Sequence, residues 1–163
     1  DLILKEKEKN MKDTFTGCYN KNGFKELCQK FLDKNPRPSY AFIMIDLDDF
    51  KAINDNFGHD TGDSVLLETV KQLREFFPRP SLIGRFGGDE FMVLCPFSQK
   101  ELLEETINHF MECTIPPYSV KKSVGYTFIP DDKIDYEEII KTADKALYTA
   151  KQKKNCAVFS SIS

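Results

Sequence analysis

The order of apolar and polar positions along the chain predicts a mixture of amphipathic helices and buried strands. Apolar side chains recur every three or four residues, the spacing of one helix face, over 24–32, 66–77, 103–111 and 139–147. Apolar runs of strand length lie at 40–45, 82–86, 91–94, 118–129 and 157–159. Because this order contains both hairpins and helical crossovers, it predicts an α+β sandwich, with a mostly antiparallel central sheet flanked by helices.

Two stretches, 1–12 and 118–129, allow more than one interpretation. Residues 1–12 are charge-rich, with Leu4 and Met11 seven positions apart, which is typical either of the end of an upstream linker helix or of a frayed terminus. Residues 50–63 are polar and rich in turn-forming residues. The run 118–129 is either one long strand or a hairpin, with a bulge expected at Gly125. We assign residues 1–12 to a linker helix and 13–163 to one domain.

Size, charge and cysteine content narrow the functional class. The chain has 163 residues and a net charge of −3, which argues against a polymerase-like activity on nucleic acid. Five cysteines without a C-x-x-C pair indicate neither a disulfide framework nor a zinc site, and favour the reducing cytoplasm. No apolar run approaches the ~18 residues of a membrane span, so this fragment is not expected to insert into a membrane. The first residue is Asp1, so we expect a fragment of a longer protein.

Two groups of acidic residues are the candidate chemistry. Asp46-Leu47-Asp48-Asp49 follows the buried run 40–45, and Gly87-Gly88-Asp89-Glu90 lies in the expected hairpin turn. Taken alone, the second group is more typical of a solvated turn, and Asp48 can equally serve to fix a loop. If the two strands are neighbours, however, the carboxylates converge. Such a site suits Mg²⁺, which prefers hard oxygen ligands and supports phosphoryl transfer.

Gly87-Gly88-Asp89-Glu90-Phe91 resembles the signature of the GGDEF domain, the diguanylate cyclase family. The resemblance runs from about Asp13 to Asn155, nearly the whole chain. Its other segments, in chain order, are Asp13-Thr14-Phe15-Thr16-Gly17 with Asn20, the stretch 46–55, the stretch 58–63, Ser123-Val124-Gly125 and 143–148. The resemblance implies a fold like the palm of adenylate cyclases and polymerases. It also implies the joining of two GTP into cyclic di-GMP, with release of two pyrophosphates.

The resemblance implies a role for each matching residue. Asp46 and Asp89 would hold Mg²⁺ with the Leu47 carbonyl, at two ions per half-site, with Mn²⁺ as a substitute. Glu90 would also lie at the metals and help to activate the 3′-hydroxyl. The residues implied for substrate binding are Gly87 and Gly88 at the α-phosphate, the Asp49 and Phe50 backbone and Lys145 at the other phosphates, and Asn54 and Asp63 at guanine. A carboxylate pairs with the two donors of guanine but is left unpaired by adenine, so Asp63 favours GTP over ATP.

Two departures from the family pattern concern regulation and phosphate binding. Thr149 stands where an arginine commonly follows Lys145 by one helical turn, and the nearby lysines that can compensate are Lys141, Lys151, Lys153 and Lys154. The position of the R-x-x-D inhibitory motif holds Pro78-Arg79-Pro80-Ser81, so product inhibition through that site is not expected.

The family pattern also implies partners. We expect a second GGDEF domain in an active homodimer and a sensor domain upstream, with membrane tethering of the full-length protein left open. The alternative function is a catalytically idle GGDEF module that binds GTP and signals by contact. His59 is expected to be a structural hydrogen-bonding residue, and Asp55, like Asp48, either fixes a loop or takes part in the site.

Overall fold

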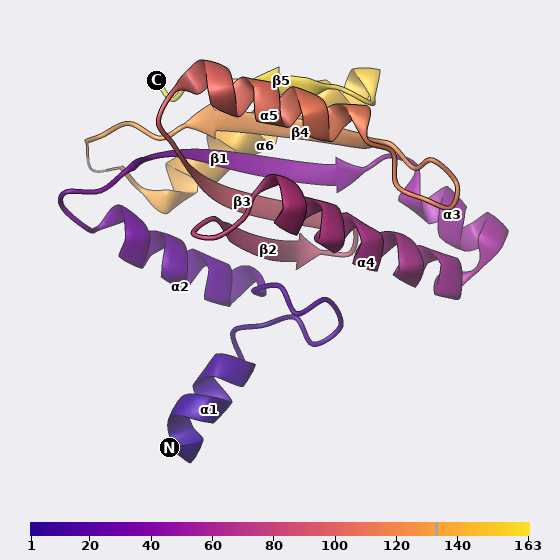
Figure 1. The fold of residues 1–163 in the computed structure, drawn as a ribbon, viewed down its shortest axis with the longest axis horizontal. Coiled ribbons are helices and arrows are strands. Elements are labelled where there is room, and N and C mark those ends of the chain that lie inside the picture. Colours follow the sequence, from indigo (N-terminus) through magenta and orange to yellow (C-terminus); the bar gives the residue numbers. More distant parts are fainter. Residues whose placement is uncertain (133) are drawn as a thin grey trace.

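A five-stranded sheet forms the centre of the molecule. The computed structural model describes residues 1–132 and 134–163 (Figure 1). The strands are β1 (Ser39–Leu47), β2 (Leu82–Gly87), β3 (Glu90–Phe97), β4 (Lys122–Phe128) and β5 (Ala157–Phe159). Their order in space is β2-β3-β1-β4-β5, and only the β4–β5 pair is parallel. The predicted α+β fold with a mostly antiparallel sheet is therefore confirmed.

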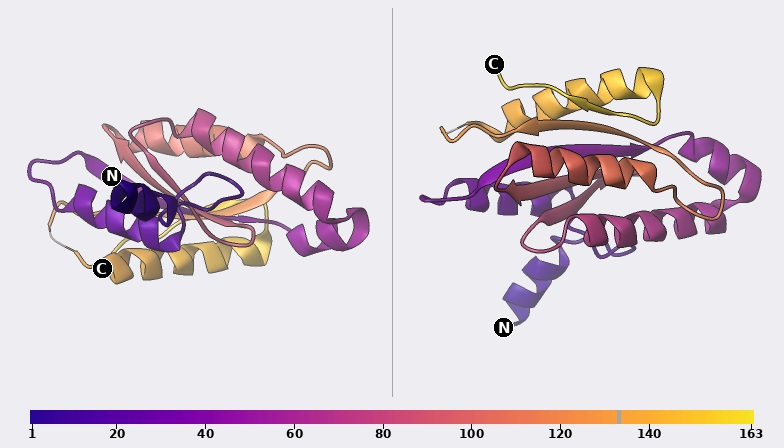
Figure 2. Two further views of the ribbon diagram at one scale, coloured as in Figure 1. Left: turned by 90° about the horizontal axis from the view of Figure 1, so that it is seen from below. Right: turned by 45° about the horizontal axis from the view of Figure 1, so that its top comes forward.

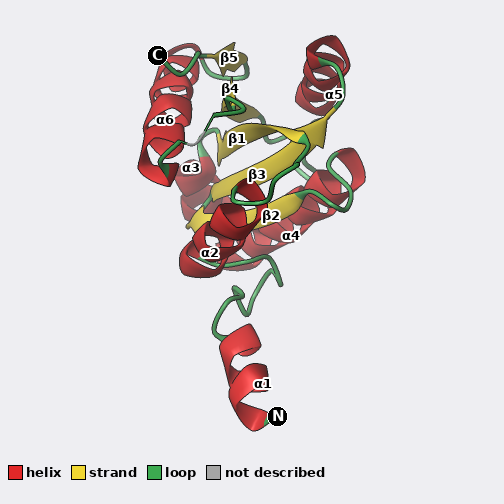
Figure 3. Ribbon diagram, turned by 90° about the vertical axis from the view of Figure 1, so that its left-hand side faces the viewer, coloured by secondary structure: helices red, strands yellow, loops and turns green. Residues whose placement is uncertain are grey.

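The helices cover both faces of this sheet. They are α1 (Leu2–Lys9), α2 (Lys21–Leu32), α3 (Phe50–Phe57), α4 (His59–Phe76), α5 (Lys100–Glu112) and α6 (Tyr136–Lys153). Helices α2 and α6 pack on one face and α4 and α5 on the other, whereas α1 stands away from the sheet (Figures 2 and 3). None of the described helices combines the length and the apolar character that a membrane crossing requires.

Strand β1 is the middle strand and contributes to both hydrophobic cores. Ile43 and Ile45 pack toward α4 and α5, and Phe42 and Met44 pack toward α2 and α6. Because alternate side chains point to opposite faces of a strand, a strand covered on both faces is apolar at every position. This explains the unbroken apolar run before Asp46. The Asp46 carboxylate therefore lies at the end of a buried, rigid strand.

The segment 50–63, expected to be polar and turn-rich, is helical. Gly58, with φ +92°, separates α3 from α4 in a conformation that favours glycine. Phe50, Ile53 and Phe57 follow helical spacing, but α3 has only eight residues and none of them is fully buried, so this short pattern does not stand out among the polar residues. A Cβ on Gly62 would lie 1.8 Å from the Asn54 side-chain oxygen, so the glycine allows α3 and α4 to pack closely.

The bulge expected at Gly125 is absent from the described strand, because Gly125 pairs in regular register with Met44 and Val158. A Cβ on Gly125 would instead lie 2.2 Å from the Leu147 backbone nitrogen. The glycine therefore lets α6 approach the sheet. The run 118–129 is neither of the forms expected, since β4 begins only at Lys122 and the residues before it form a loop.

Candidate active site

The hairpin and the end of β1 bring the two acidic groups together. Asp46 of β1 is the direct cross-strand partner of Glu90 of β3, and the Leu47 N–H donates to the Asp89 carbonyl at 3.3 Å. The expectation that these strands are neighbours is confirmed. The side chains of Asp46, Asp89 and Glu90 therefore share one edge of the sheet, although their roles there stay predictions.

The turn between β2 and β3 leaves open space beside these acids. Only Gly88 and Asp89 lie between the two strands, and Gly88 has φ +48°. A Cβ added to Gly87 or Gly88 would meet no atom within 4 Å. This free space fits the expectation that a ligand approaches the backbone there.

Arg85 fixes the same turn and was not among the predicted site residues. Its guanidinium donates to the Gly88 carbonyl from Nε at 2.9 Å and from Nη2 at 2.7 Å, and Nη1 lies 3.2 Å from the Asp13 carboxylate. Asp13 also accepts from the Thr16 backbone and hydroxyl. The Asp13-to-Gly17 motif therefore orients the arginine that holds the signature turn. An arginine just before a double glycine was the one available signal.

Asp46 is buried, with 2% of its surface exposed, and its only cationic partner among the described residues is Lys151. The Lys151 Nζ lies 2.7 Å from Asp46 Oδ2. Lys154, also from the end of α6, lies 2.7 Å from Asp49 Oδ1. Two of the four lysines considered as substitutes for an arginine at 149 thus pair with the acidic group at the end of β1.

Electrostatic crowding at this edge favours binding of a cation. Burial, and after it the Asp46 carboxylate, raise the pKa of Asp89 to about 6 against the opposing Lys151 charge. Burial and Asp46 likewise raise the pKa of Glu90 to about 6. Among the described residues, no three His, Cys, Asp or Glu side chains are yet arranged as ligands of one ion. The donor set of three carboxylates nevertheless fits Mg²⁺ chemically.

Asp48, two residues after Asp46, has a different environment. It is 9% exposed, and its carboxylate accepts from the Ser123 hydroxyl at 2.6 Å and the Asn155 N–H at 2.8 Å. These bonds tie the end of β1 to β4 and to the turn after α6. Of the two interpretations of Asp48, the structure therefore supports the loop-fixing one.

Comparison with known proteins places this arrangement in a family. The profile described as "Diguanylate cyclase, GGDEF domain" matches residues 10–156, most of the chain. This chain belongs to the GGDEF domain family. Family membership alone does not fix the activity, because relatives named for opposite activities match this chain.

Three relatives illustrate this range. The probable diguanylate cyclase DgcC of Escherichia coli K12 is 33% identical over 86% of this chain and 40% of its own length. The cyclic di-GMP phosphodiesterase PdeR of the same strain is 29% identical over 86% of this chain and 22% of its own length. The crystal structure of the Pseudomonas aeruginosa diguanylate cyclase SiaD in complex with its activator SiaC matches with a TM-score of 0.83 and 30% identity, covering 98% of this chain and 65% of that one. This GGDEF domain thus spans less than half the length of DgcC and PdeR.

The other residues expected to bind nucleotide lie on α3, α4 and α6 of this GGDEF domain, whereas Asp46, Asp89 and Glu90 form what we call the acidic edge. Asn54 and Asp63 come from the closely packed α3 and α4, and Asp63 is exposed. Asp49 has φ +57° and precedes α3, and its side chain does not accept from the first N–H groups of that helix. Lys145 is exposed on α6.

The two departures from the family pattern are at the surface. The Thr149 hydroxyl donates only to the Lys145 carbonyl, at 3.3 Å, among the described residues. Pro78, Arg79 and Pro80 are exposed in the segment before β2. His59 and Asp55 are exposed as well, which adds no support for a structural role of either.

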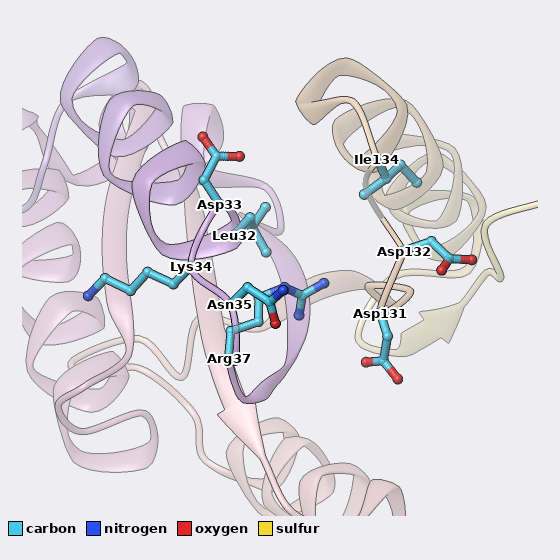
Figure 4. Close-up of a pocket in the computed structure, with 8 residues that line it drawn as sticks. All are labelled: Leu32, Asp33, Lys34, Asn35, Arg37, Asp131, Asp132 and Ile134. Carbon is cyan, nitrogen blue, oxygen red and sulfur yellow. The ribbon is translucent and has the colours of Figure 1, made fainter.

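A cavity of about 420 Å³ lies at the opposite end of the sheet (Figure 4). It is lined by Leu32, Asp33, Lys34, Asn35, Arg37, Asp131, Asp132 and Ile134. These residues lie before the start of β1 or after the end of β4. The two acidic groups lie at the end of β1 and in the turn between β2 and β3 beside it. None of the lining residues was predicted for the site, so the size of this cavity does not make it the candidate active site.

Proposed function

We propose that this GGDEF domain is one half of a diguanylate cyclase. Two copies, each holding one GTP, join their substrates by attack of each 3′-hydroxyl on the α-phosphate of the other GTP. Two phosphodiester bonds form, two pyrophosphates leave, and two protons are released. The observation that carries this proposal is the convergence of Asp46, Asp89 and Glu90 beside an intact Gly87-Gly88 turn.

The residues proposed to hold Mg²⁺ are the Asp46, Asp89 and Glu90 carboxylates and the Leu47 carbonyl. Three carboxylates within one partly buried group repel one another unless cations neutralise them, and burial together with the Asp46 charge raises the pKa values of Asp89 and Glu90. When bound, Mg²⁺ or Mn²⁺ would neutralise charge on the phosphate oxygens and orient the reacting groups.

Glu90 is the proposed proton acceptor for the 3′-hydroxyl. Its place beside Asp46 and Asp89 would bring its carboxylate close to a hydroxyl held at the metal. Gly87 and Gly88 give the α-phosphate access to the backbone, and Lys145 and the N–H groups at the start of α3 bind the other phosphates.

Asn54 and Asp63 are proposed to select guanine. The close packing of α3 on α4 at Gly62 supports a joint role for these two side chains. The variant Asp63→Ser is therefore expected to accept ATP more readily. Competition between GTP and ATP measures this, and an unchanged preference for GTP contradicts the role.

The proposed partners are a second copy of this domain and a sensor domain elsewhere in a longer, cytoplasmic chain. A second copy is required because each half-site holds one GTP. The greater length of the curated relatives supports further domains.

The test is incubation with GTP and Mg²⁺ under enforced dimerisation, with chromatographic detection of cyclic di-GMP. The expected result is product from the wild type and a loss of more than about 100-fold in Glu90→Ala. The alternative is the catalytically idle module, for which the only sequence feature is Thr149. Tight GTP binding without product would establish that alternative.

A further inference from the structure

We propose that Lys151 is the resident counter-ion of the acidic edge, which a divalent cation displaces from Asp46, so that Lys151 sets how tightly the edge binds the ion. This inference rests on the proposed function, because it takes Asp46 as a metal ligand. The new element is that Lys151 of the same chain competes with the metal ion for the Asp46 carboxylate.

In the ion pair between Lys151 and Asp46, the lysine is the mobile partner because only its side chain is exposed. The Asp46 side chain is only 3% exposed, and its backbone is paired with Glu90 on one side and Ser123 on the other. The Lys151 side chain is 45% exposed and lies in the last turn of α6 on a flexible four-carbon stem. Lys151 can therefore leave the contact by rotamer change, whereas Asp46 is fixed.

The charges at the edge also do not balance. One ammonium faces the carboxylates of Asp46, Asp89 and Glu90, so the group keeps an excess of negative charge when the acids are ionised. A divalent ion bound to Asp46 would neutralise more of this charge than Lys151 does and would repel the ammonium. The two cations therefore compete for one carboxylate.

Lys154 does not act in the same way. It pairs with Asp49, and both side chains of that pair are more than half exposed, so solvent screens the interaction. Lys153, between the two, is exposed and makes no ion pair with a described residue. It carries the same charge on the same helix turn and is the matched control.

The first experiment measures Mn²⁺ binding without nucleotide, from the spin-resonance signal of free Mn²⁺. The variants are Lys151→Met and Lys153→Met, which each remove one charge and keep a long apolar stem. Lys151→Met is expected to bind Mn²⁺ about fivefold more tightly than the wild type, and Lys153→Met within about twofold of it.

The outcomes separate this inference from the proposed function. Equal or weaker binding by Lys151→Met overturns the inference while the metal site stands, because Lys151 would then be a permanent support of Asp46. Absence of Mn²⁺ binding by all three proteins overturns both the metal site and the inference.

A second experiment uses only the wild type, so it does not depend on the folding of a variant. An amine-reactive ester labels lysines, and peptide mass spectrometry reports the labelling rate of Lys151 relative to Lys153. Saturating Mg²⁺ is expected to raise the Lys151 rate by about threefold or more, because the ammonium is released from its carboxylate. An unchanged or lower rate contradicts displacement.

Discussion

Asp46 and Asp48 are both buried at the end of β1, yet their surroundings differ in kind. Asp48 accepts hydrogen bonds from Ser123 and Asn155, neutral donors that belong to the fold. Asp46 faces two further carboxylates and an ion pair with a half-exposed lysine. A buried charge satisfied by fixed neutral donors stabilises a structure, whereas one crowded by like charges is held at a cost in stability.

The partners of a buried carboxylate therefore indicate its role better than its exposed fraction does. Perturbed pKa values often occur at functional sites, and the only carboxylates among the described residues with a pKa raised to about 6, Asp89 and Glu90, lie beside Asp46. The comparison yields four predictions.

The variant Asp46→Asn has the largest expected effect. Cyclase activity should fall by more than about 100-fold, since a charged ligand of the reacting centre is lost. Folding stability should not fall by more than about 0.5 kcal/mol, because like-charge repulsion is relieved at the same time. Cyclic di-GMP production and urea unfolding measure the two effects. An active variant, or a strongly destabilised one, would contradict the assignment of Asp46 to the site and not to the fold.

The variant Asp48→Asn should behave in the opposite way. One carboxylate oxygen becomes an amide donor, so either the Ser123 or the Asn155 bond is impaired in a buried position. The expected loss is about 2 kcal/mol in the free energy of unfolding. The matched control is Asp55→Asn, which changes an exposed aspartate and should stay within about 0.5 kcal/mol of the wild type. Equal stability of the two variants would show that the hydrogen bonds of Asp48 do not stabilise the fold.

Lys122 tests whether Asp48 also depends on a nearby charge. Lys122 is 0% exposed, its ammonium donates to the Cys113 carbonyl, and burial lowers its pKa to about 8. Because Asp48 already has two donors, Lys122→Met should remove a costly buried charge and raise stability by about 1 kcal/mol at pH 7.

The pH dependence of this gain has a definite sign. Between about pH 8 and pH 10.5 the folded state binds fewer protons at Lys122 than the unfolded state, so the wild type gains stability from this residue as pH rises. The advantage of Lys122→Met is therefore full below pH 8 and fades toward pH 10.5. Urea unfolding at pH 7 and pH 10 checks this, and a variant less stable than the wild type at pH 7 refutes it.

The smallest expected effect concerns the metal-free protein in acid. The pKa values of Asp89 and Glu90 are raised to about 6 in the folded state, so these groups favour folding below their ordinary pKa values. That contribution is lost as pH rises through about 6. Asp46→Asn should reduce this loss by less than about 1 kcal/mol, because burial, the larger cause, remains. Thermal unfolding from pH 4 to pH 7 with a chelator present measures it, and parallel curves for both proteins argue against coupling.

Much of the acidic edge was predictable because its elements carry strong local patterns. The apolar run ending at Asp46 predicts a central strand, and the double glycine between two apolar runs predicts the hairpin that brings Glu90 opposite. The contacts that orient these residues were not predictable. Lys151 lies 105 positions from Asp46 in sequence, and an exposed helix lysine is usually only solvated.

Local sequence patterns did not predict helix α3, the regular pairing of Gly125 or the role of Asp48. Helix α3 has only eight residues, so the helical spacing of Phe50, Ile53 and Phe57 is too short to distinguish it from a polar turn. Gly125 suggested a bulge, but its lack of a side chain serves the approach of α6, a partner that strand pattern alone does not reveal. In the same way, sequence left Asp48 between two roles until Ser123 and Asn155 were seen to contact it.

The most direct test is an anomalous diffraction map from crystals grown with Mn²⁺ and a GTP analogue whose α,β-methylene bridge prevents release of pyrophosphate. The predicted result is manganese density between the carboxylates of Asp46, Asp89 and Glu90, with the Lys151 ammonium moved away and Asp48 still bonded to Ser123 and Asn155. Manganese at Asp48, or nucleotide bound with Lys151 still on Asp46 and no ion at the acidic edge, would contradict the account.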